Sequence, residues 1–314
     1  MNESAHPDDA ARVRAWLADA IAARVDGDAV AWLRDQLAKI ALGASDAALP
    51  LALGRAPRML GKAELAPAPE LVERARALRP GFDASAWSVD QAARVLFVLA
   101  TWDGDAAAFA RRIDRLADTA EVNESVAIHL GFALYPPARV LEPRARMAVR
   151  SGIRPVFEAI AHRNPYPGEV FDEPAWNQMI VKTFFLDSAL WPVQGLERRA
   201  NPALTRMLVD LARERRAAGR RVAPQLWRCV RPDHEPAAAD ALAQAWRTGS
   251  LVERLAICKS LAGSSSPAAQ ALLAEGRKDG LVARAAATGW PALEAAAPDF
   301  PFEPSPGDLR HATN

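Results

Sequence analysis

The residues whose types could support chemistry gather within the stretch 162–227. A helix expected over 174–187 carries Asn177, Gln178 and Lys182 among aromatic and aliphatic side chains. Burying an amide without a hydrogen-bond partner costs on the order of 2–7 kcal/mol, so these groups must be paired inside the fold or with a ligand. Paired with a ligand, they would form a pocket with a polar floor and aromatic walls, in which the Lys182 ammonium meets an anion.

Each of these groups also has a structural interpretation. The two amides would bind loop backbone, and Lys182 would pair with an acid such as Asp172 or Asp187. His162 ends a predicted helix, where the helix dipole stabilises a charged imidazole, so capping is its simpler explanation. A ligand contact or an acid–base role is the alternative. The candidate pocket consists of the side chains of this stretch that could face one ligand: His162, Asn164, Tyr166, Asn177, Gln178, Lys182, Arg199 and Trp227.

The sequence contains none of the motifs that identify common enzyme classes. There is no H-E-x-x-H, no P-loop, no G-x-S-x-G, and no G-x-G-x-x-G after a strand. Asp233, His234 and Glu235 are interpreted as the cap and first turn of a helix, and His129 as a core histidine. The basic run 213–221 is interpreted as a solvated helix end, with a phosphate or nucleic-acid contact as the alternative. No metal, cofactor or catalytic residue is therefore predicted.

Composition limits the function classes further. The chain has 314 residues, half of them hydrophobic and a quarter charged, and its formal net charge is +1. This composition is typical of a globular protein with a full core, and the near-zero charge argues against a nucleic-acid binder. Cys229 and Cys258 form no C-x-x-C pair, the segment 1–9 is not hydrophobic, and no window of about 18 apolar residues could cross a membrane. We expect a cytoplasmic protein without a transmembrane segment.

The elements that position these residues are all predicted to be helices. Apolar residues recur at spacings of three and four, and no stretch shows the alternation of a strand. The helices follow one another through short loops, which indicates antiparallel helix pairs. Their period of roughly 30–40 residues is typical of an α-solenoid of the HEAT or armadillo kind. An irregular large helical bundle is the alternative architecture.

Local signals place several helix ends. The segment Ser88-Val-Asp-Gln91 reads as a capping box, and the apolar run 95–99 that follows indicates a helix buried on all sides. A long helix is expected over 201–219, with an Asn-Pro start and a glycine stop. Pro50 is expected to kink or interrupt the helix that begins near Ser45.

Several short motifs occur together in the central stretch. They are Asn164-Pro-Tyr-Pro167, Ala175-Trp-Asn-Gln-Met179 with Lys182, Arg199-Ala-Asn-Pro202, Met207-Leu-Val-Asp210, Ala217-Ala-Gly-Arg220, and Pro224 through Leu226-Trp227. Through these motifs the chain resembles the bacterial EboA family, over about 160–230 and the helices before it. The resemblance fades after about 235. It suggests an EboA-like helical domain at 1–232 with its core at 162–227, a C-terminal helical repeat at 233–290, and a Pro-rich, partly disordered tail at 291–314.

The resemblance implies a role rather than a reaction. EboA-like proteins are associated with bacterial gene clusters that also encode a prenyltransferase-like membrane enzyme, a metal-dependent hydrolase-like protein and sugar-isomerase-like barrels. Those clusters are linked to moving secondary-metabolite precursors towards the cell envelope. We therefore expect a non-catalytic scaffold or binding protein, whose partners are other proteins of the cluster or an amphiphilic or prenylated metabolite, and which is peripheral at the inner membrane through such partners. The alternatives are an enzyme acting on an anionic small molecule near Lys182 and His162, and an α-solenoid that binds nucleic acid.

Overall fold

The computed structural model describes residues 7–41, 45–136 and 138–296. Within these ranges every regular element is a helix and no β-strand is present, although one isolated β-bridge occurs. The all-α prediction is therefore confirmed. Most of the tail predicted at 291–314 lies outside the described residues.

The chain packs as two units, and the division falls within helix α11 (Glu173–Phe185). Each unit combines two segments: Met1–Met179 with Pro192–Gly195 in unit 1, and Ile180–Trp191 with Leu196–Asn314 in unit 2. The domain boundary predicted after residue 232 was placed where the family motifs end, and it lies inside unit 2. That boundary stays a prediction.

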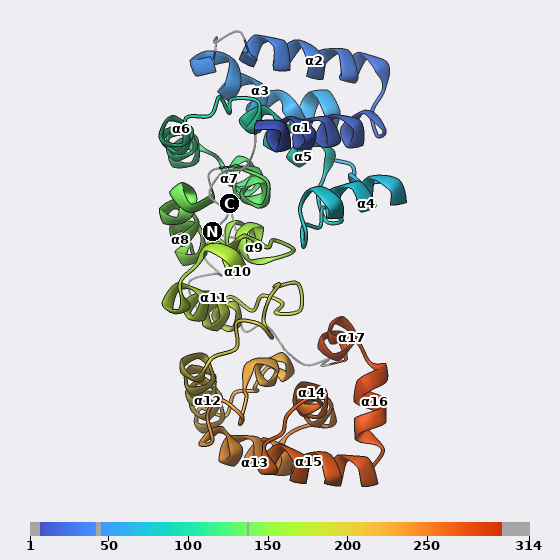
Figure 1. The fold of residues 1–314 in the computed structure, drawn as a ribbon, viewed down its shortest axis with the longest axis vertical. Coiled ribbons are helices and arrows are strands. Elements are labelled where there is room, and N and C mark those ends of the chain that lie inside the picture. Colours follow the sequence, from blue (N-terminus) through green and yellow to red (C-terminus); the bar gives the residue numbers. More distant parts are fainter. Residues whose placement is uncertain (1–6, 42–44, 137, 297–314) are drawn as a thin grey trace, which may run out of the picture. The chain divides into compact units, whose positions relative to one another are not determined.

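Unit 1 contains the helices of the first half of the chain. In chain order they are α1 (Pro7–Ala22), α2 (Gly27–Ala41), α3 (Ser45–Leu60), α4 (Pro69–Leu78), α5 (Val89–Leu99), α6 (Ala106–Thr119), α7 (Val122–Leu130), the 3-10 helices η1 (Gly131–Ala133) and η2 (Ala138–Leu141), α8 (Glu142–Arg150), α9 (Arg154–Ala161) and α10 (Tyr166–Val170). Three of them, α5, α7 and α9, contact one another in succession. Helices α1, α2 and α3 pack on α5, while α6 and α8 lie beside α7 and α9 (Figure 1). The HEAT-like repeat stays a prediction.

Helix α5 lies at the centre of unit 1 because its sequence is apolar on all sides. The run 95–99 is buried throughout, as predicted. The predicted capping box of Ser88 and Gln91 is present, and the backbone N–H of Ser88 donates to Gln91 Oε1 at 2.9 Å. The Ser88 hydroxyl also donates to Asp90 Oδ1 at 2.5 Å, so this side chain serves a buried carboxylate within the first turn as well.

An ion pair is buried in the same helix. Arg94 and Asp90 are 2% and 4% exposed, and the Arg94 guanidinium donates to Asp90 Oδ2 at 3.2 Å. Arg94 Nε also donates to the carbonyl of Leu53 on α3, at 2.9 Å. The pair therefore fastens α3 to α5 in addition to neutralising two charges.

Helix α3 departs from the interruption expected at Pro50. It continues through both Pro50 and Pro57, although each proline removes a hydrogen bond and costs about 3 kcal/mol in a helix interior. Leu49, Leu53 and Ala56 of this helix are buried, and α3 packs against α5 and α2. Burying a leucine contributes about 1.5–3 kcal/mol, so packing offsets the local penalty.

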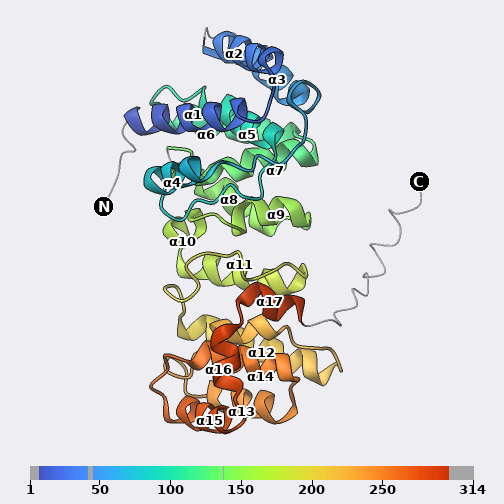
Figure 2. The same ribbon diagram turned by 90° about the vertical axis from the view of Figure 1, so that its right-hand side faces the viewer.

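Unit 2 contains the remaining helices, arranged around α14. After α11 they are α12 (Pro202–Ala217), η3 (Pro224–Cys229), α13 (Ala238–Thr248), α14 (Leu251–Leu261), α15 (Pro267–Lys278), α16 (Leu281–Ala287) and α17 (Trp290–Ala295). Helix α14 contacts η3, α13, α15, α16 and α17 (Figure 2). Helix α12 packs against η3 and α13.

The ends of α12 follow the predicted signals. Asn201 Oδ1 accepts the backbone N–H of Leu204 at 2.8 Å, which caps the first turn. Gly219 follows the last turn with φ +68, a left-handed conformation that glycine adopts without strain. The long helix expected over 201–219 is therefore confirmed.

The sequence suggested that Asp233 caps the helix that follows it, but its carboxylate binds elsewhere. Its carboxylate accepts hydrogen bonds from the Ser264 hydroxyl (2.5 Å) and from the backbone N–H groups of Ser265 (3.0 Å) and Ser266 (2.9 Å). Those residues precede α15, so Asp233 fastens a loop about 30 residues further along the chain. Helix α13 begins later, at Ala238.

Candidate ligand-binding site

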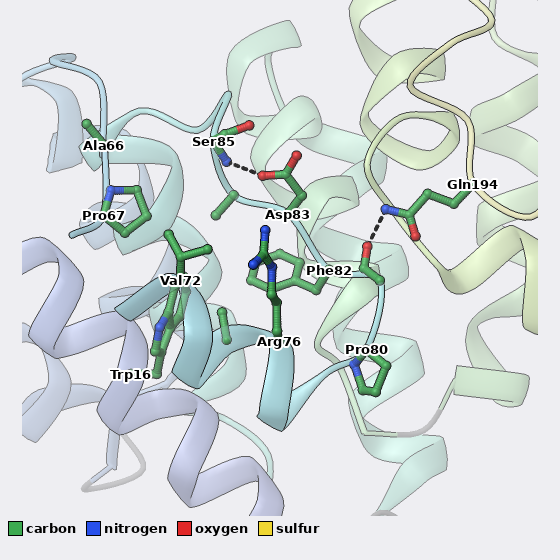
Figure 3. Close-up of a pocket in the computed structure, with 13 residues that line it drawn as sticks. Trp16, Ala66, Pro67, Val72, Arg76, Pro80, Phe82, Asp83, Ser85 and Gln194 are labelled. Carbon is green, nitrogen blue, oxygen red and sulfur yellow. Dashed lines mark hydrogen bonds between the residues drawn. The ribbon is translucent and has the colours of Figure 1, made fainter. Parts of the chain in front are cut away.

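A pocket of about 760 Å³ opens in unit 1 between α4 and the loop 80–85. Its lining comes from α1, from the two segments on either side of α4, from α4 itself and from the turn 192–195 (Figure 3). The lining residues are Trp16, Ala66, Pro67, Val72, Ala75, Arg76, Pro80, Gly81, Phe82, Asp83, Ala84, Ser85 and Gln194. All of them belong to one unit, and they are brought together from positions far apart in the chain.

The inner wall of this pocket is apolar and well packed. Trp16 and Phe82 are 1% and 4% exposed, and their rings meet edge to face with centroids 5.6 Å apart. Phe82 makes a second edge-to-face contact with Trp87, at 5.2 Å. The Trp16 indole N–H donates to the carbonyl of Leu71 at 2.7 Å, which ties α1 to the first turn of α4. Val72, one turn before Arg76 along α4, adds apolar surface to the lining (Figure 3).

The mouth of the pocket is polar. Arg76 donates to Glu73 Oε1 at 2.5 Å, on the same helix. Asp83 Oδ1 accepts the backbone N–H of Ser85 at 2.8 Å, and Asp83 Oδ2 lies 3.4 Å from Arg163 Nε. Each charge at the mouth therefore already faces an opposite charge.

The turn 192–195 holds the loop 80–85 in place. Gln194 Nε2 donates to the carbonyl of Gly81 (Figure 3). Gly81 has φ +82, and a Cβ there would stand 2.5 Å from Gln194 Oε1 and 3.3 Å from Pro165. Only glycine permits both this backbone conformation and this close approach.

Two of the three non-glycine residues with positive φ in the described chain lie near the same loops, and the third, Asp187, belongs to unit 2. Ala66, in the lining, has φ +36, and Arg163, the partner of Asp83, has φ +49. Non-glycine residues in this region are strained by roughly 1–2 kcal/mol each. Such strain clusters at ligand sites, because the surrounding structure must hold it for a purpose. The strain is a second reason to treat this pocket as a site.

Three of the sequence-predicted site residues lie in or next to the connector that supports the loop 80–85. His162 follows α9 and is half-buried. Asn164 is 3% exposed and its Oδ1 accepts the backbone N–H of Tyr166 at 3.0 Å. The Tyr166 hydroxyl donates to the carbonyl of Ala138 at 2.5 Å, and burial raises the pKa of this phenol. Asn164 and Tyr166 thus shape the connector, and none of the three lines the pocket.

The side chains of α11 differ in how far they are exposed to solvent. Asn177 is 3% exposed and has an interaction partner, whereas Gln178 is exposed. Trp176 and Phe184, predicted to be buried, are 0% and 7% exposed, so that prediction is confirmed. Phe185, however, is 63% exposed, so α11 is not apolar-packed all round.

Lys182, Arg199 and Trp227 belong to unit 2. Lys182 is half-buried, and burial lowers the pKa of its ammonium. Arg199 is half-buried, and its carbonyl accepts a hydrogen bond from Asn201 Nδ2 at 3.1 Å. The assignment of the eight predicted residues to one ligand pocket stays a prediction.

Trp227 is a core residue with a specific polar partner. It is 0% exposed, and its indole N–H donates to Glu253 Oε1 at 2.7 Å. The Arg216 guanidinium donates to the same oxygen at 2.6 Å and lies 5.3 Å from the Trp227 ring centroid. Burial raises the pKa of the Glu253 carboxyl, and the bonds from Trp227 and Arg216 act in the opposite direction.

Other ionisable groups of the interior have structural surroundings. His129 Nδ1 lies 2.7 Å from the carbonyl of Ser125, and its ring stacks on Phe132 with centroids 5.4 Å apart. Burial lowers the pKa of His129 to about 4, so the imidazole is neutral at pH 7. Burial raises the pKa of the thiols of Cys229 to about 12 and of Cys258 to about 11. A thiol with a raised pKa is a poor nucleophile.

Two features are absent from the described part of the chain. No group of three or more His, Cys, Asp or Glu side chains in it is arranged to hold a metal ion. None of its helices combines the length and the apolar character needed to cross a bilayer.

Sequence reasoning missed the pocket because its lining is dispersed. Residues 61–69 and the Pro80-Gly81 turn read only as loops, and nothing local indicates that they meet Gln194. The one usable signal was the glycine at position 81, since a turn glycine with a close neighbour often marks a backbone approach.

The comparisons with known proteins identify the family of the chain. A family model described as metabolite traffic protein EboA matches residues 13–231, well over half of the chain. No curated protein and no solved structure gives a significant match. The matched region includes every residue that lines the pocket. The chain belongs to the EboA family.

Proposed function

We propose that the protein is a non-catalytic binding protein that carries an amphiphilic metabolite in the pocket of unit 1. The observation that carries this proposal is the division of the pocket into an apolar inner wall and a polar mouth. Trp16, Val72 and Phe82 offer apolar surface, while Arg76 and Gln194 stand at the mouth. Ligand pockets are typically lined in this way, with a few polar groups that fix orientation.

The composition of the lining favours binding over catalysis. Its ionisable side chains are Arg76 and Asp83, and each already faces an opposite charge. Ser85 is the only hydroxyl side chain of the lining, and the lining holds no histidine, lysine or cysteine. The one lining carboxylate, Asp83, accepts the backbone N–H of Ser85 and faces Arg163 rather than the Ser85 hydroxyl. Nucleophilic catalysis requires a nucleophile within hydrogen-bond reach of a base that activates it. The described lining supplies no such pair.

The family supports a role in metabolite traffic. Its description names that role, and the whole pocket lies inside the matched region. The pathway part of the proposal, carriage of secondary-metabolite or prenyl precursors towards the cell envelope with other proteins of a gene cluster, rests on the family resemblance.

Binding of a neutral fluorescent amphiphile tests the proposal. N-phenyl-1-naphthylamine should bind with a stoichiometry of one per chain and become more fluorescent in the apolar pocket. Val72→Trp should fill the pocket and weaken binding at least tenfold, because Val72 lies in the wall. Val122→Trp is the matched control, since Val122 is a half-exposed valine on α7 outside the lining. Circular dichroism checks that both variants fold.

Two results would contradict the proposal. One is absence of probe binding to the parent protein. The other is equal binding by the parent and Val72→Trp, which would place the bound probe elsewhere on the chain.

A further inference from the structure

We infer that the pocket selects amphiphiles whose polar head is uncharged, such as an alcohol, over amphiphiles with a phosphorylated or cationic head. This inference rests on the proposed function and names the ligand class for the same site. It follows from the charges and hydrogen-bonding groups at the mouth.

The two charges of the mouth are already compensated. Arg76 pairs with Glu73 at 2.5 Å, and Asp83 pairs with Arg163 at 3.4 Å. The guanidinium of Arg76 is the only cation of the lining, and the carboxylate of Asp83 is its only anion. The mouth therefore carries no net charge, and a charged head would find each opposite charge already partly neutralised.

A phosphorylated head meets a further obstacle. A phosphate monoester carries about 1.5 to 2 negative charges at pH 7, and the Asp83 carboxylate faces the same mouth. Asp83 cannot turn away freely, because its Oδ1 accepts the Ser85 N–H at 2.8 Å and its Oδ2 faces Arg163. Like charges held in one site repel, so the fixed carboxylate offsets the attraction of Arg76, which Glu73 already partly neutralises. A cationic head is repelled by Arg76 and gains little from Asp83, because Arg163 already faces that carboxylate.

An uncharged hydroxyl head can form hydrogen bonds at the mouth without breaking an existing ion pair. Gln194 uses one amide hydrogen on the Gly81 carbonyl, which leaves its Oε1 and its second hydrogen for a ligand. The Ser85 hydroxyl is exposed in the lining and can both donate and accept. Each of these two side chains offers both a donor and an acceptor to a hydroxyl head.

Three amphiphiles with the same ten-carbon chain test the inference. 1-Decanol, decyl phosphate and decylammonium are each titrated against N-phenyl-1-naphthylamine bound to the full chain, below their micelle concentrations. We expect 1-decanol to displace the probe with an affinity at least tenfold higher than that of either ion. Asp83→Asn removes the fixed negative charge and should tighten decyl phosphate about tenfold relative to 1-decanol, so that the preference for the alcohol narrows by that factor.

Asp103→Asn is the matched control for that substitution. Asp103 Oδ1 accepts the backbone N–H of Asp105 at 3.0 Å, the same local turn that Asp83 makes with Ser85, and Asp103 lies outside the lining. It should leave all three affinities unchanged.

The outcomes separate this inference from the proposed function. If the probe fails to bind, or ignores Val72→Trp, the proposed function is wrong and the inference falls with it. If the probe binds in the pocket but 1-decanol does not displace it, or either ion binds as tightly as 1-decanol, the inference alone is wrong. An unchanged preference for 1-decanol over decyl phosphate in Asp83→Asn would show that Asp83 is not the cause of the selectivity, and would also overturn it.

Discussion

Replacing Arg94 by methionine should destabilise unit 1 strongly, because Arg94 is one half of a buried ion pair. The substitution keeps a long side chain of similar reach but removes every charge and donor. It leaves the Asp90 carboxylate, 4% exposed, with the Ser88 hydroxyl at 2.5 Å but without its cation. It also removes the donor to the carbonyl of Leu53, which is part of the α3–α5 contact.

The magnitude follows from burial. Removing one partner of a buried pair costs about 3–5 kcal/mol, because the other charge stays desolvated. The remaining bond from Ser88 places the expected loss for Arg94→Met near the lower end, at about 3 kcal/mol. Replacing both partners, as in Asp90→Leu with Arg94→Met, should recover most of that loss, since apolar side chains of similar volume often replace a buried pair without penalty.

The chain offers a matched control for this experiment. Asp35 and Lys39 have the same i,i+4 spacing in α2, and their charged atoms are 2.5 Å apart, but both side chains are more than half exposed. Exposed pairs contribute about 0–1 kcal/mol, so Lys39→Met should be nearly neutral. The assay is urea unfolding followed by circular dichroism, with hydrogen exchange of α5 peptides as a local readout. Equal losses in Arg94→Met and Lys39→Met would refute the reasoning.

Three further predictions concern titratable groups. The pKa of His129 is about 4 in the fold against 6.5 unfolded, so its contribution to stability is present above pH 6.5 and is lost as the pH falls towards 4; His129→Gln should remove this part of the pH dependence of the urea midpoint. The hydrogen bond from the Ser264 hydroxyl is the main cause of the lowered pKa of Asp233, and the contribution of Asp233 to stability is lost as the pH falls through its folded pKa. Ser264→Ala should therefore unfold at a higher pH in an acid titration followed by circular dichroism. Burial lowers the pKa of Lys182 below 10.5, so the stability lost by keeping its charged form in the fold is recovered as the pH rises through the lowered pKa. The melting temperature should therefore gain this contribution in alkaline solution, and Lys182→Met should remove the gain.

The buried pair shows what hydrophobic patterning can and cannot predict. The apolar run 95–99 correctly indicated a helix enclosed by others, because no face of it suits water. The same pattern could not reveal the Asp90–Arg94 pair. An acid and a base four residues apart also occur at Asp35 and Lys39, where the pair is exposed, so the spacing alone does not report burial.

Side chains near helix ends were the hardest to assign. Asp233 precedes a helical pattern and so looked like a cap, but it binds three serines that follow it by about 30 residues. Phe185 continued the apolar pattern of α11, yet it lies in the last turn and is 63% exposed. In both cases the deciding contact, or its absence, involves tertiary neighbours that a local window does not contain.

The central motif gains a physical role from the pocket it supports. The connector Asn164-Pro-Tyr-Pro167 contributes no lining residue, but Pro165 stands behind Gly81 and the preceding Arg163 faces Asp83. The connector is rigid, since Asn164 and Tyr166 are buried and hydrogen-bonded. None of the predicted site residues lines this pocket, but the connector that contains Asn164 and Tyr166 lies against the loop 80–85 that does. Because the wall is held by contacts between segments far apart in the chain, a substitution in the connector should alter ligand affinity without touching the ligand.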